Sequence, residues 1–152
     1  NIFDTISVCF SKGLGCPVGS ALIGNKEDME KALRIRKVFG GGMRQSGYLA
    51  AAALFALEKN RSRLKKDHMR AKEIASALNK LSFMKSIEPV STNIIIFSLI
   101  SEKTETKFLN LLKEKNIHII SLGKGKLRIV THHDYTEKHH EYFLNFIKKI
   151  NL

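Results

Sequence analysis

A lysine in a glycine-rich loop is the residue of this sequence best placed to do chemistry. Lys12 lies in the stretch Ser11–Ser20, directly after a run of alternating apolar and polar residues, Thr5–Phe10. Such alternation predicts a strand, and glycines let the chain turn tightly at its end. The amine of a lysine held there can attack a carbonyl carbon and form a Schiff base. The alternative is that Lys12 is a solvated loop charge, as most lysines are.

A second candidate is Arg44, which follows three consecutive glycines, Gly40–Gly42. We expect a helix to begin at Met43, and the free N–H groups of a helix N-terminus favour an anion. The residues alone leave equally open that the glycines only separate two helices and that Arg44 lies on the surface. A nucleotide P-loop is excluded because no Lys-Ser or Lys-Thr pair follows the glycines. The loop after Lys12 is one residue off the dinucleotide pattern.

A third candidate, Arg128, lies in the middle of a predicted strand, on the face opposite Leu127 and Ile129. An arginine there needs an acidic partner or a ligand, because an unpaired buried charge is costly. An ion pair within the fold and an anionic ligand both meet this requirement. The histidines are weaker candidates. No carboxylate and cysteine set near His139 and His140 completes a metal site, so we expect no metal.

Three blocks of the sequence resemble the low-specificity L-threonine aldolases, which depend on pyridoxal 5'-phosphate and have the aspartate-aminotransferase-like fold (fold type I). The blocks are Ser11–Ser20, Arg36–Gln45 and Arg128–His132. They occur in the family's order and approximate spacing over most of the chain. This resemblance implies an α/β fold, with the C-terminal part of the large fold type I domain followed by a small α+β domain.

The resemblance also implies roles for individual residues. Lys12 would bind the cofactor covalently, and Arg44, with Lys37, would lie near the cofactor phosphate, across a subunit interface. Arg128 would hold the α-carboxylate of the substrate with two hydrogen bonds. Ser11 either bonds the phosphate or stabilises the turn.

The family cleaves L-threonine or L-allo-threonine to glycine and acetaldehyde, in threonine catabolism and glycine biosynthesis. Its members are homotetramers, built as dimers of dimers. The resemblance implies that the main phosphate loop and the residues that contact the cofactor ring lie upstream. We therefore expect this chain to be a C-terminal portion that is inactive alone. The alternatives are another fold type I lyase or aminotransferase, and a catalytically inactive remnant or basic binding module.

Composition limits the partners and the location. The 152 residues are 43% hydrophobic and have a formal net charge of +12. The basic residues are scattered and form no nucleic-acid-binding motif, so nucleic acid is a minor alternative. No apolar run is long enough to span a bilayer, and we expect no membrane partner. Cys9 and Cys16 are interpreted as free thiols of a reducing compartment, the cytoplasm.

The predicted elements place a domain boundary near residue 60. Residues 1–60 are expected to end the large domain. Their predicted elements are strands at 4–10 and 20–24, a helix from the cap Asn25 to Val38, and an apolar helix that begins at Met43 and is either buried or packed between two layers.

Residues 61–152 are expected to form the small domain, with a βαββα-like order on an open sheet covered by helices on one face. A long amphipathic helix is predicted over 61–81. The strands are predicted at 93–99, 117–121 and 127–131, and a helix at 104–115. Thr136 is predicted to cap the last helix, with His139 in its core stripe. Asn93 is expected to tie down strand backbone.

Overall fold

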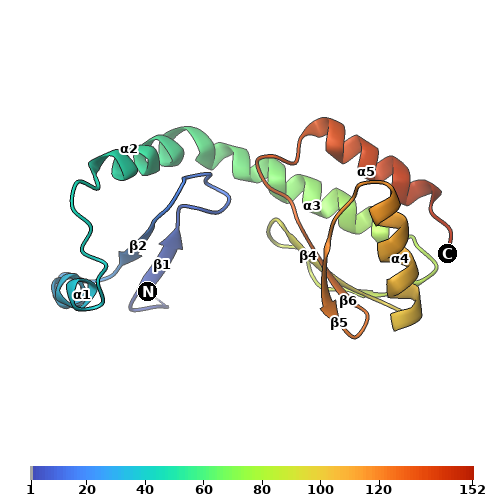
Figure 1. Cartoon of the computed structure of the whole chain (residues 1–152), viewed down its shortest axis with the longest axis horizontal. Coiled ribbons are helices and arrows are strands. Elements are labelled where there is room, and N and C mark those ends of the chain that lie inside the picture. The colour runs from blue at the N-terminus through green and yellow to red at the C-terminus, as the bar shows by residue number, and fades with distance from the viewer. Residues whose placement is uncertain (1) are drawn as a thin grey trace. The chain divides into compact units, whose positions relative to one another are not determined.

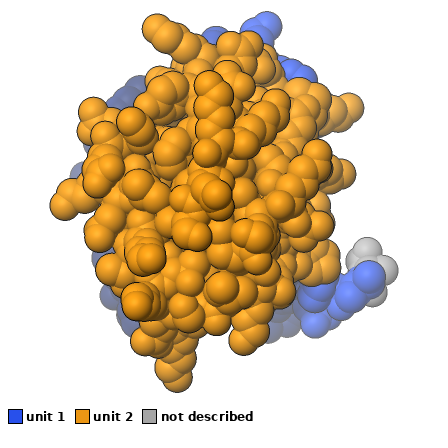
Figure 2. All heavy atoms as spheres, turned by 90° about the vertical axis from the view of Figure 1, so that its right-hand side faces the viewer, with its two compact units in different colours: residues 1–63 blue, residues 64–152 orange. Residues whose placement is uncertain are grey.

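The computed structural model describes residues 2–152, and the chain divides into two compact units at Arg63 and Leu64 (Figure 1). Figure 2 colours the two units separately. That unit 1 (residues 1–63) and unit 2 (residues 64–152) are parts of a large and a small domain stays a prediction. No helix among the described residues is long and apolar enough to cross a membrane.

The first unit begins with a strand pair that frames the lysine loop. β1 (Ile6–Cys9) and β2 (Ser20–Ile23) are antiparallel, with Cys9 opposite Ser20. The two predicted strands are confirmed. α1 (Lys26–Val38) starts where predicted, because the Asn25 side chain accepts a hydrogen bond of 2.9 Å from the amide of Asp28.

The apolar helix of unit 1 differs from its prediction in both start and burial. α2 spans Gly47–Phe55, so the predicted start at Met43 is wrong. Gln45 has a left-handed φ of 50°, which interrupts a helix, and Ser46 is the N-cap. The predicted burial is also wrong, because Leu54 and Phe55 are 61% and 60% exposed. No layer of described residues covers this helix.

Two short irregular helices follow α2 directly and end the unit. They are a π-helix, η1 (Ala56–Asn60), and a single 3-10 turn, η2 (Arg61–Arg63). The helix predicted from residue 61 is therefore α-helical only from Leu64. Local sequence does not distinguish these tighter and wider turns from an ordinary α-helix.

Unit 2 contains three helices and four strands: α3 (Leu64–Leu78), β3 (Met84–Ile87), β4 (Ile94–Leu99), α4 (Glu102–Glu114), β5 (Ile120–Gly123), β6 (Lys126–Val130) and α5 (Glu137–Lys149). The strands form one antiparallel sheet in the order β3-β4-β6-β5. The predicted βαββα order lacked β3, whose bulge between Met84 and Ser86 interrupts the alternation that marks a strand. The predicted strand at 117–121 is displaced, because β5 begins at Ile120.

One face of this sheet carries the core of unit 2, as expected, with the helices packed against it (Figure 1). Alternate residues of β4 and β6 point into it, as the period of a strand requires. The largest buried side chains from strands and helices are Ile95, Phe97, Leu127, Ile74, Leu78, Phe108, Leu112 and Ile147.

The last helix presents a different histidine to the core from the one predicted. Thr136 caps α5 and forms a capping box with His139, as the N-cap prediction required. His139 itself is exposed, so its predicted core position is wrong. His140 is buried instead, because its ring bonds Glu73 Oε2 at 2.6 Å and the hydroxyl of Tyr135 at 3.2 Å.

Candidate functional site

The lysine loop is a turn closed by its own backbone. The amide of Gly15 donates to the carbonyl of Lys12 at 2.9 Å, and the amide of Cys16 donates to the carbonyl of Phe10 at 3.1 Å. Gly15 has a φ of +78°, a conformation that favours glycine. Lys12 therefore occupies the first position of a hydrogen-bonded turn, directly after β1.

Two side chains of this loop form its anchor in unit 1. Leu14 and Cys16 are buried, although most of the unit is exposed. The thiol of Cys16 lies 3.7 Å from the carbonyl oxygen of Ala52 on α2, and Ala56 at the start of η1 is also buried. The apolar positions on either side of Gly15 thus attach the turn to the helical segment α2–η1.

Two polar side chains hold the same turn from the end of that segment. Asn60 Nδ2 donates to the carbonyl oxygen of Leu14 at 2.8 Å, and an Arg63 terminal nitrogen donates to that of Gly13 at 2.6 Å. Neither residue was identified from the sequence as part of the site. No local signal marks a contact between residues 46 and 50 positions apart.

The remaining predicted residues of unit 1 lie on its surface. Ser11, Lys12, Lys37 and Arg44 are exposed, and in the described part of the chain their side chains have no hydrogen bond or ion pair. The exposed charges of Lys12, Lys37 and Arg44 are therefore available to a ligand.

The glycine run brings the segment before Arg44 back along the end of α1. A Cβ added at Gly42 would lie 3.2 Å from Cγ of Lys37, and one at Gly41 would lie 3.0 Å from Cγ of Arg36. Only residues without a side chain fit this close return of the chain. The expected helix N-terminus beside Arg44 is absent, because α2 starts three residues later at Gly47. Any anion bound by Arg44 would therefore meet its guanidinium rather than a helix terminus.

Arg128 lies in the centre of β6, between Ile96 of β4 and Ile120 of β5. It is half-buried on the face opposite Leu127 and Ile129, as predicted. Its Nε is buried without a hydrogen-bond partner, and among residues 2–152 it has no ion pair. Of the two alternatives, an ion pair within the fold is excluded for the described residues, and the anionic ligand stays a prediction.

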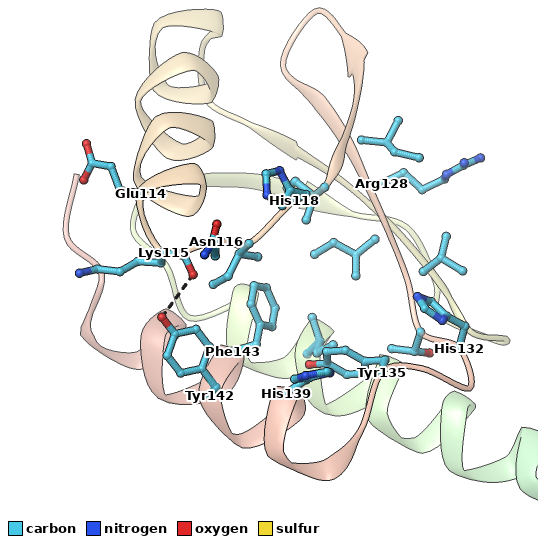
Figure 3. Close-up of a pocket in the computed structure, with 17 residues that line it drawn as sticks. Glu114, Lys115, Asn116, His118, Arg128, His132, Tyr135, His139, Tyr142 and Phe143 are labelled. Atoms are coloured by element: carbon cyan, nitrogen blue, oxygen red, sulfur yellow. Dashed lines mark hydrogen bonds between the residues drawn. The ribbon is translucent and has the colours of Figure 1, made fainter.

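A pocket of about 780 Å³ opens beside this strand in unit 2 (Figure 3). Arg128 lies at one rim, and the lining includes His118, Tyr135, His139 and Tyr142. The hydroxyl of Tyr142 bonds the carbonyl of Lys115 at 3.3 Å on the opposite side. The pocket is therefore bounded by the chain before β5, by β6 and by α5.

Thr131, the first residue after β6, is held by hydrogen bonds to two other segments of the chain. The backbone amide of Thr131 donates to the carbonyl of Asn93 at 3.0 Å, and the side chain of Asn93 donates to the Thr131 carbonyl at 2.7 Å. The expectation that Asn93 ties down strand backbone is confirmed. The Thr131 hydroxyl donates to the backbone carbonyl of Asp67 on α3, also at 2.7 Å. The C-terminal end of the strand that carries Arg128 is therefore held by two neighbouring segments.

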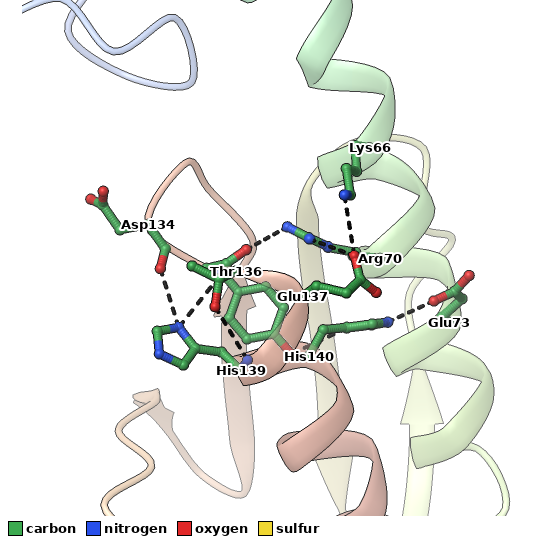
Figure 4. Close-up of polar contacts among 9 residues, drawn as sticks. Lys66, Arg70, Glu73, Asp134, Thr136, Glu137, His139 and His140 are labelled. Carbon is green, nitrogen blue, oxygen red and sulfur yellow. Dashed lines mark hydrogen bonds and ion pairs between the residues drawn. The ribbon is translucent and has the colours of Figure 1, made fainter.

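A polar cluster joins the next turn to α3 (Figure 4). The buried Arg70 donates to the backbone carbonyl of Tyr135 and, at 2.8 Å, to the carboxylate of Glu137. The hydrogen bond from Arg70, followed by that from Lys66, lowers the pKa of Glu137. Burial raises the pKa of the Tyr135 hydroxyl, opposed by the nearby Arg70 charge. Tyr135 therefore remains a neutral phenol at ordinary pH.

The β5–β6 hairpin is hydrogen-bonded to a buried glutamate of α4. Glu105 on α4 is buried and accepts hydrogen bonds from the Ser121 hydroxyl at 2.5 Å and the Gly125 amide at 2.7 Å. These bonds attach the β5–β6 hairpin to α4. Within residues 2–152, no three His, Cys, Asp or Glu side chains gather as a metal site would require.

Comparisons with known proteins give a consistent family and fold. The family model described as beta-eliminating lyase matches residues 1–101. Low-specificity L-threonine aldolase 1 of Arabidopsis thaliana is 40% identical over 152 residues, which cover 98% of this chain and 42% of the relative. The crystal structure of a protein described as an L-allo-threonine aldolase from Listeria monocytogenes matches with a TM-score of 0.72 at 21% identity, over 97% of this chain and 44% of that one.

A serine palmitoyltransferase from S. paucimobilis, solved with PLP and myriocin bound, matches with a TM-score of 0.70 at 16% identity, over 96% of this chain and 39% of that one. These two structural likenesses confirm the predicted fold type I class. The chain spans less than half the length of the relatives it matches.

Proposed function

The chain belongs to the beta-eliminating lyase family, and from this premise we propose that it is part of a pyridoxal-phosphate-dependent threonine aldolase. The complete enzyme would cleave L-threonine or L-allo-threonine to glycine and acetaldehyde. The observation that carries the proposal is the hydrogen-bonded turn that begins at Lys12, inside the region that the family model matches.

The residues of unit 1 fit pyridoxal phosphate by their chemistry. Lys12 supplies a primary amine to the aldehyde carbon of the cofactor, from a turn that its own carbonyl closes. Lys37 and Arg44 supply two cations that have no hydrogen bond or ion pair within residues 2–152, which suits a phosphate group. Ser11 adds a hydroxyl next to the lysine. When bound, the cofactor supplies a ring that accepts the electrons of the bond broken at the α-carbon.

In unit 2, Arg128 is the group that we assign to the substrate α-carboxylate. Among the described residues its buried Nε has no hydrogen-bond partner, which supports this role, because a buried N–H donor without a partner gains from an anionic ligand. Strand pairing on both sides restricts its backbone. The residue would orient the amino acid so that the bond to be broken faces the cofactor.

The assembly and the location belong to the same proposal. Among the described residues Lys37 and Arg44 are exposed and have no hydrogen bond or ion pair, which supports their serving the site of a neighbouring subunit. We therefore propose a homo-oligomer, a dimer of dimers. Cys9 and Cys16 form no disulfide, which supports a cytoplasmic enzyme.

Replacement of Lys12 in the complete enzyme tests the proposal. Borohydride reduction in the presence of pyridoxal phosphate should attach the cofactor to the peptide that contains Lys12, as read by mass spectrometry. Lys12→Ala should abolish this attachment and lower acetaldehyde formation from threonine by about 10³-fold or more. Lys26→Ala, an exposed lysine on α1, should leave both measurements unchanged. Attachment to a different lysine would rule the assignment out.

A further inference from the structure

We infer that Asn60 and Arg63 are positioning residues for Lys12, which hold the lysine turn from the helical end of unit 1. The inference rests on the proposed function of Lys12 and extends it to two residues that touch neither the cofactor nor the substrate. Both are half-buried and lie in unit 1 with the loop.

Three successive carbonyl oxygens define how the turn is held. The Lys12 carbonyl accepts from the amide of Gly15, which closes the turn from inside. The next two carbonyls, of Gly13 and Leu14, point outward to Arg63 and Asn60 at 2.6 and 2.8 Å. The peptide planes that follow Lys12 are therefore oriented by donors from outside the loop.

The irregular helical end explains how both donors reach the turn. The π-helix η1 ends at Asn60, and the 3-10 turn η2 ends at Arg63. Residues three positions apart share one face of a helical segment, so both side chains can meet the same loop. Asn60 also packs directly on the turn, because a Cβ added at Gly15 would lie 3.7 Å from its Nδ2. π-Helical turns often occur at functional sites because they re-aim the residues that follow.

Few buried side chains other than these contacts hold the lysine loop in place, so the two donors affect where the lysine amine lies. Among the described residues of unit 1, the buried apolar side chains are Leu14 and Cys16 of the loop and Ala56 of η1. If Asn60 loses its donor, the Leu14 carbonyl must bond water instead, and if Arg63 loses its donor, the Gly13 carbonyl must do so. In either case the turn that starts at Lys12 changes its average conformation. The lysine amine then samples more directions and meets the cofactor aldehyde less often in a reactive geometry.

The test uses Asn60→Asp in the complete enzyme, because aspartate keeps the shape of asparagine and removes the donated hydrogen bond. In the cofactor-free enzyme, we expect the amides of Gly15 and Cys16 to exchange with deuterium about tenfold faster than in the wild type, the change expected for one lost hydrogen bond. After addition of pyridoxal phosphate, we expect attachment at Lys12, trapped by borohydride, to be slower by a similar factor of about ten.

Matched variants separate positioning from a general effect. Asn110→Asp makes the same chemical change at an exposed position of α4 and should leave exchange and attachment unchanged. Arg63→Ala should act in the same direction as Asn60→Asp, and Arg63→Lys, which keeps one cationic donor, should restore part of the wild-type rate. Arg61→Ala, on the exposed side of the same turn, should have no effect.

Wild-type exchange and attachment in both Asn60→Asp and Arg63→Ala would overturn the inference. Slower attachment without faster amide exchange would also overturn it, because the turn would then be intact. Failure of the proposed function gives a different result: the wild-type enzyme would not attach the cofactor at Lys12. In that case the exchange rates of Gly15 and Cys16 would still decide whether the two side chains hold the turn.

Discussion

Arg128 is held by its strand rather than by hydrogen bonds of its own side chain. Its backbone is paired between Ile96 and Ile120, while its Nε is buried without a partner. The guanidinium of Arg128 can therefore donate two parallel hydrogen bonds from its planar group to a bound anion. A lysine ammonium at the same place would carry the charge but could not make two parallel hydrogen bonds to one carboxylate.

For the complete enzyme we therefore predict that Arg128→Lys raises the KM for threonine by about 10- to 100-fold, which corresponds to a lost hydrogen bond to a charged group. Covalent attachment of pyridoxal phosphate at Lys12 should be unchanged, because Lys12 lies in the other unit. Steady-state kinetics and borohydride trapping measure the two effects. Arg34→Lys, an exposed arginine on α1, is the control. An unaltered KM would contradict the role of Arg128.

Residue types and spacing could predict Lys12 and Arg128 as candidates because each is marked by its immediate neighbours. A lysine between a strand and glycines, and an arginine within an apolar strand, are local signals. No local sequence signal identifies Asn60 and Arg63, because their hydrogen-bond partners lie 46 and 50 residues away. Contacts of that range depend on how the elements pack, which one sequence does not display.

At the scale of elements, helix starts were predictable where a side chain caps them. Asn25 and Thr136 both accept the hydrogen bond that a cap requires. The start of α2 was not predictable in this way, because Ser46 makes no capping bond and Gln45 adopts a left-handed conformation. β3 was missed because a bulge interrupts its alternation.

The contact between α3 and α5 includes ion pairs, so its stability depends on the ionisation of a carboxylate. Arg70 is buried, and Glu137 bonds both Arg70 and Lys66, at 2.8 and 3.2 Å. These bonds favour the ionised carboxylate and lower its pKa in the folded state. A group with a lowered pKa stabilises the fold above its unfolded pKa. That stabilisation disappears as the pH falls through the lowered value.

We predict that the free energy of unfolding decreases as the pH falls below 4.5, the ordinary pKa of a glutamate, partly because Glu137 takes up a proton. Glu137→Gln should be less stable than the wild type at pH 7, and the difference should shrink as the pH is lowered. Urea denaturation at a series of pH values measures both. Glu114→Gln, an exposed glutamate at the end of α4, should show no such convergence. A constant difference between Glu137→Gln and wild type would contradict the linkage.

At the scale of the whole molecule, the two units differ in how much apolar surface they bury. Unit 2 has one continuous core, in which side chains from its sheet pack with those of α3, α4 and α5. Unit 1 buries Leu14, Cys16 and Ala56, while large apolar side chains such as Phe39, Leu54 and Phe55 remain exposed. Exposed apolar surface of this extent is typical of a face that another part of a protein covers.

The folding of the separate units tests this difference. Because hydrophobic burial is the main favourable contribution to folding, residues 64–152 should unfold cooperatively in urea when produced alone. Residues 1–63 should lack a cooperative transition, since a unit of about 60 residues is marginal even with a complete core. Circular dichroism and the dispersion of amide NMR signals measure both outcomes. In the complete enzyme, deuterium exchange in α2 should be slow, because there we expect its apolar side chains to be covered. A cooperative transition in residues 1–63 alone would show instead that the strand pair and α2 stabilise each other without further partners.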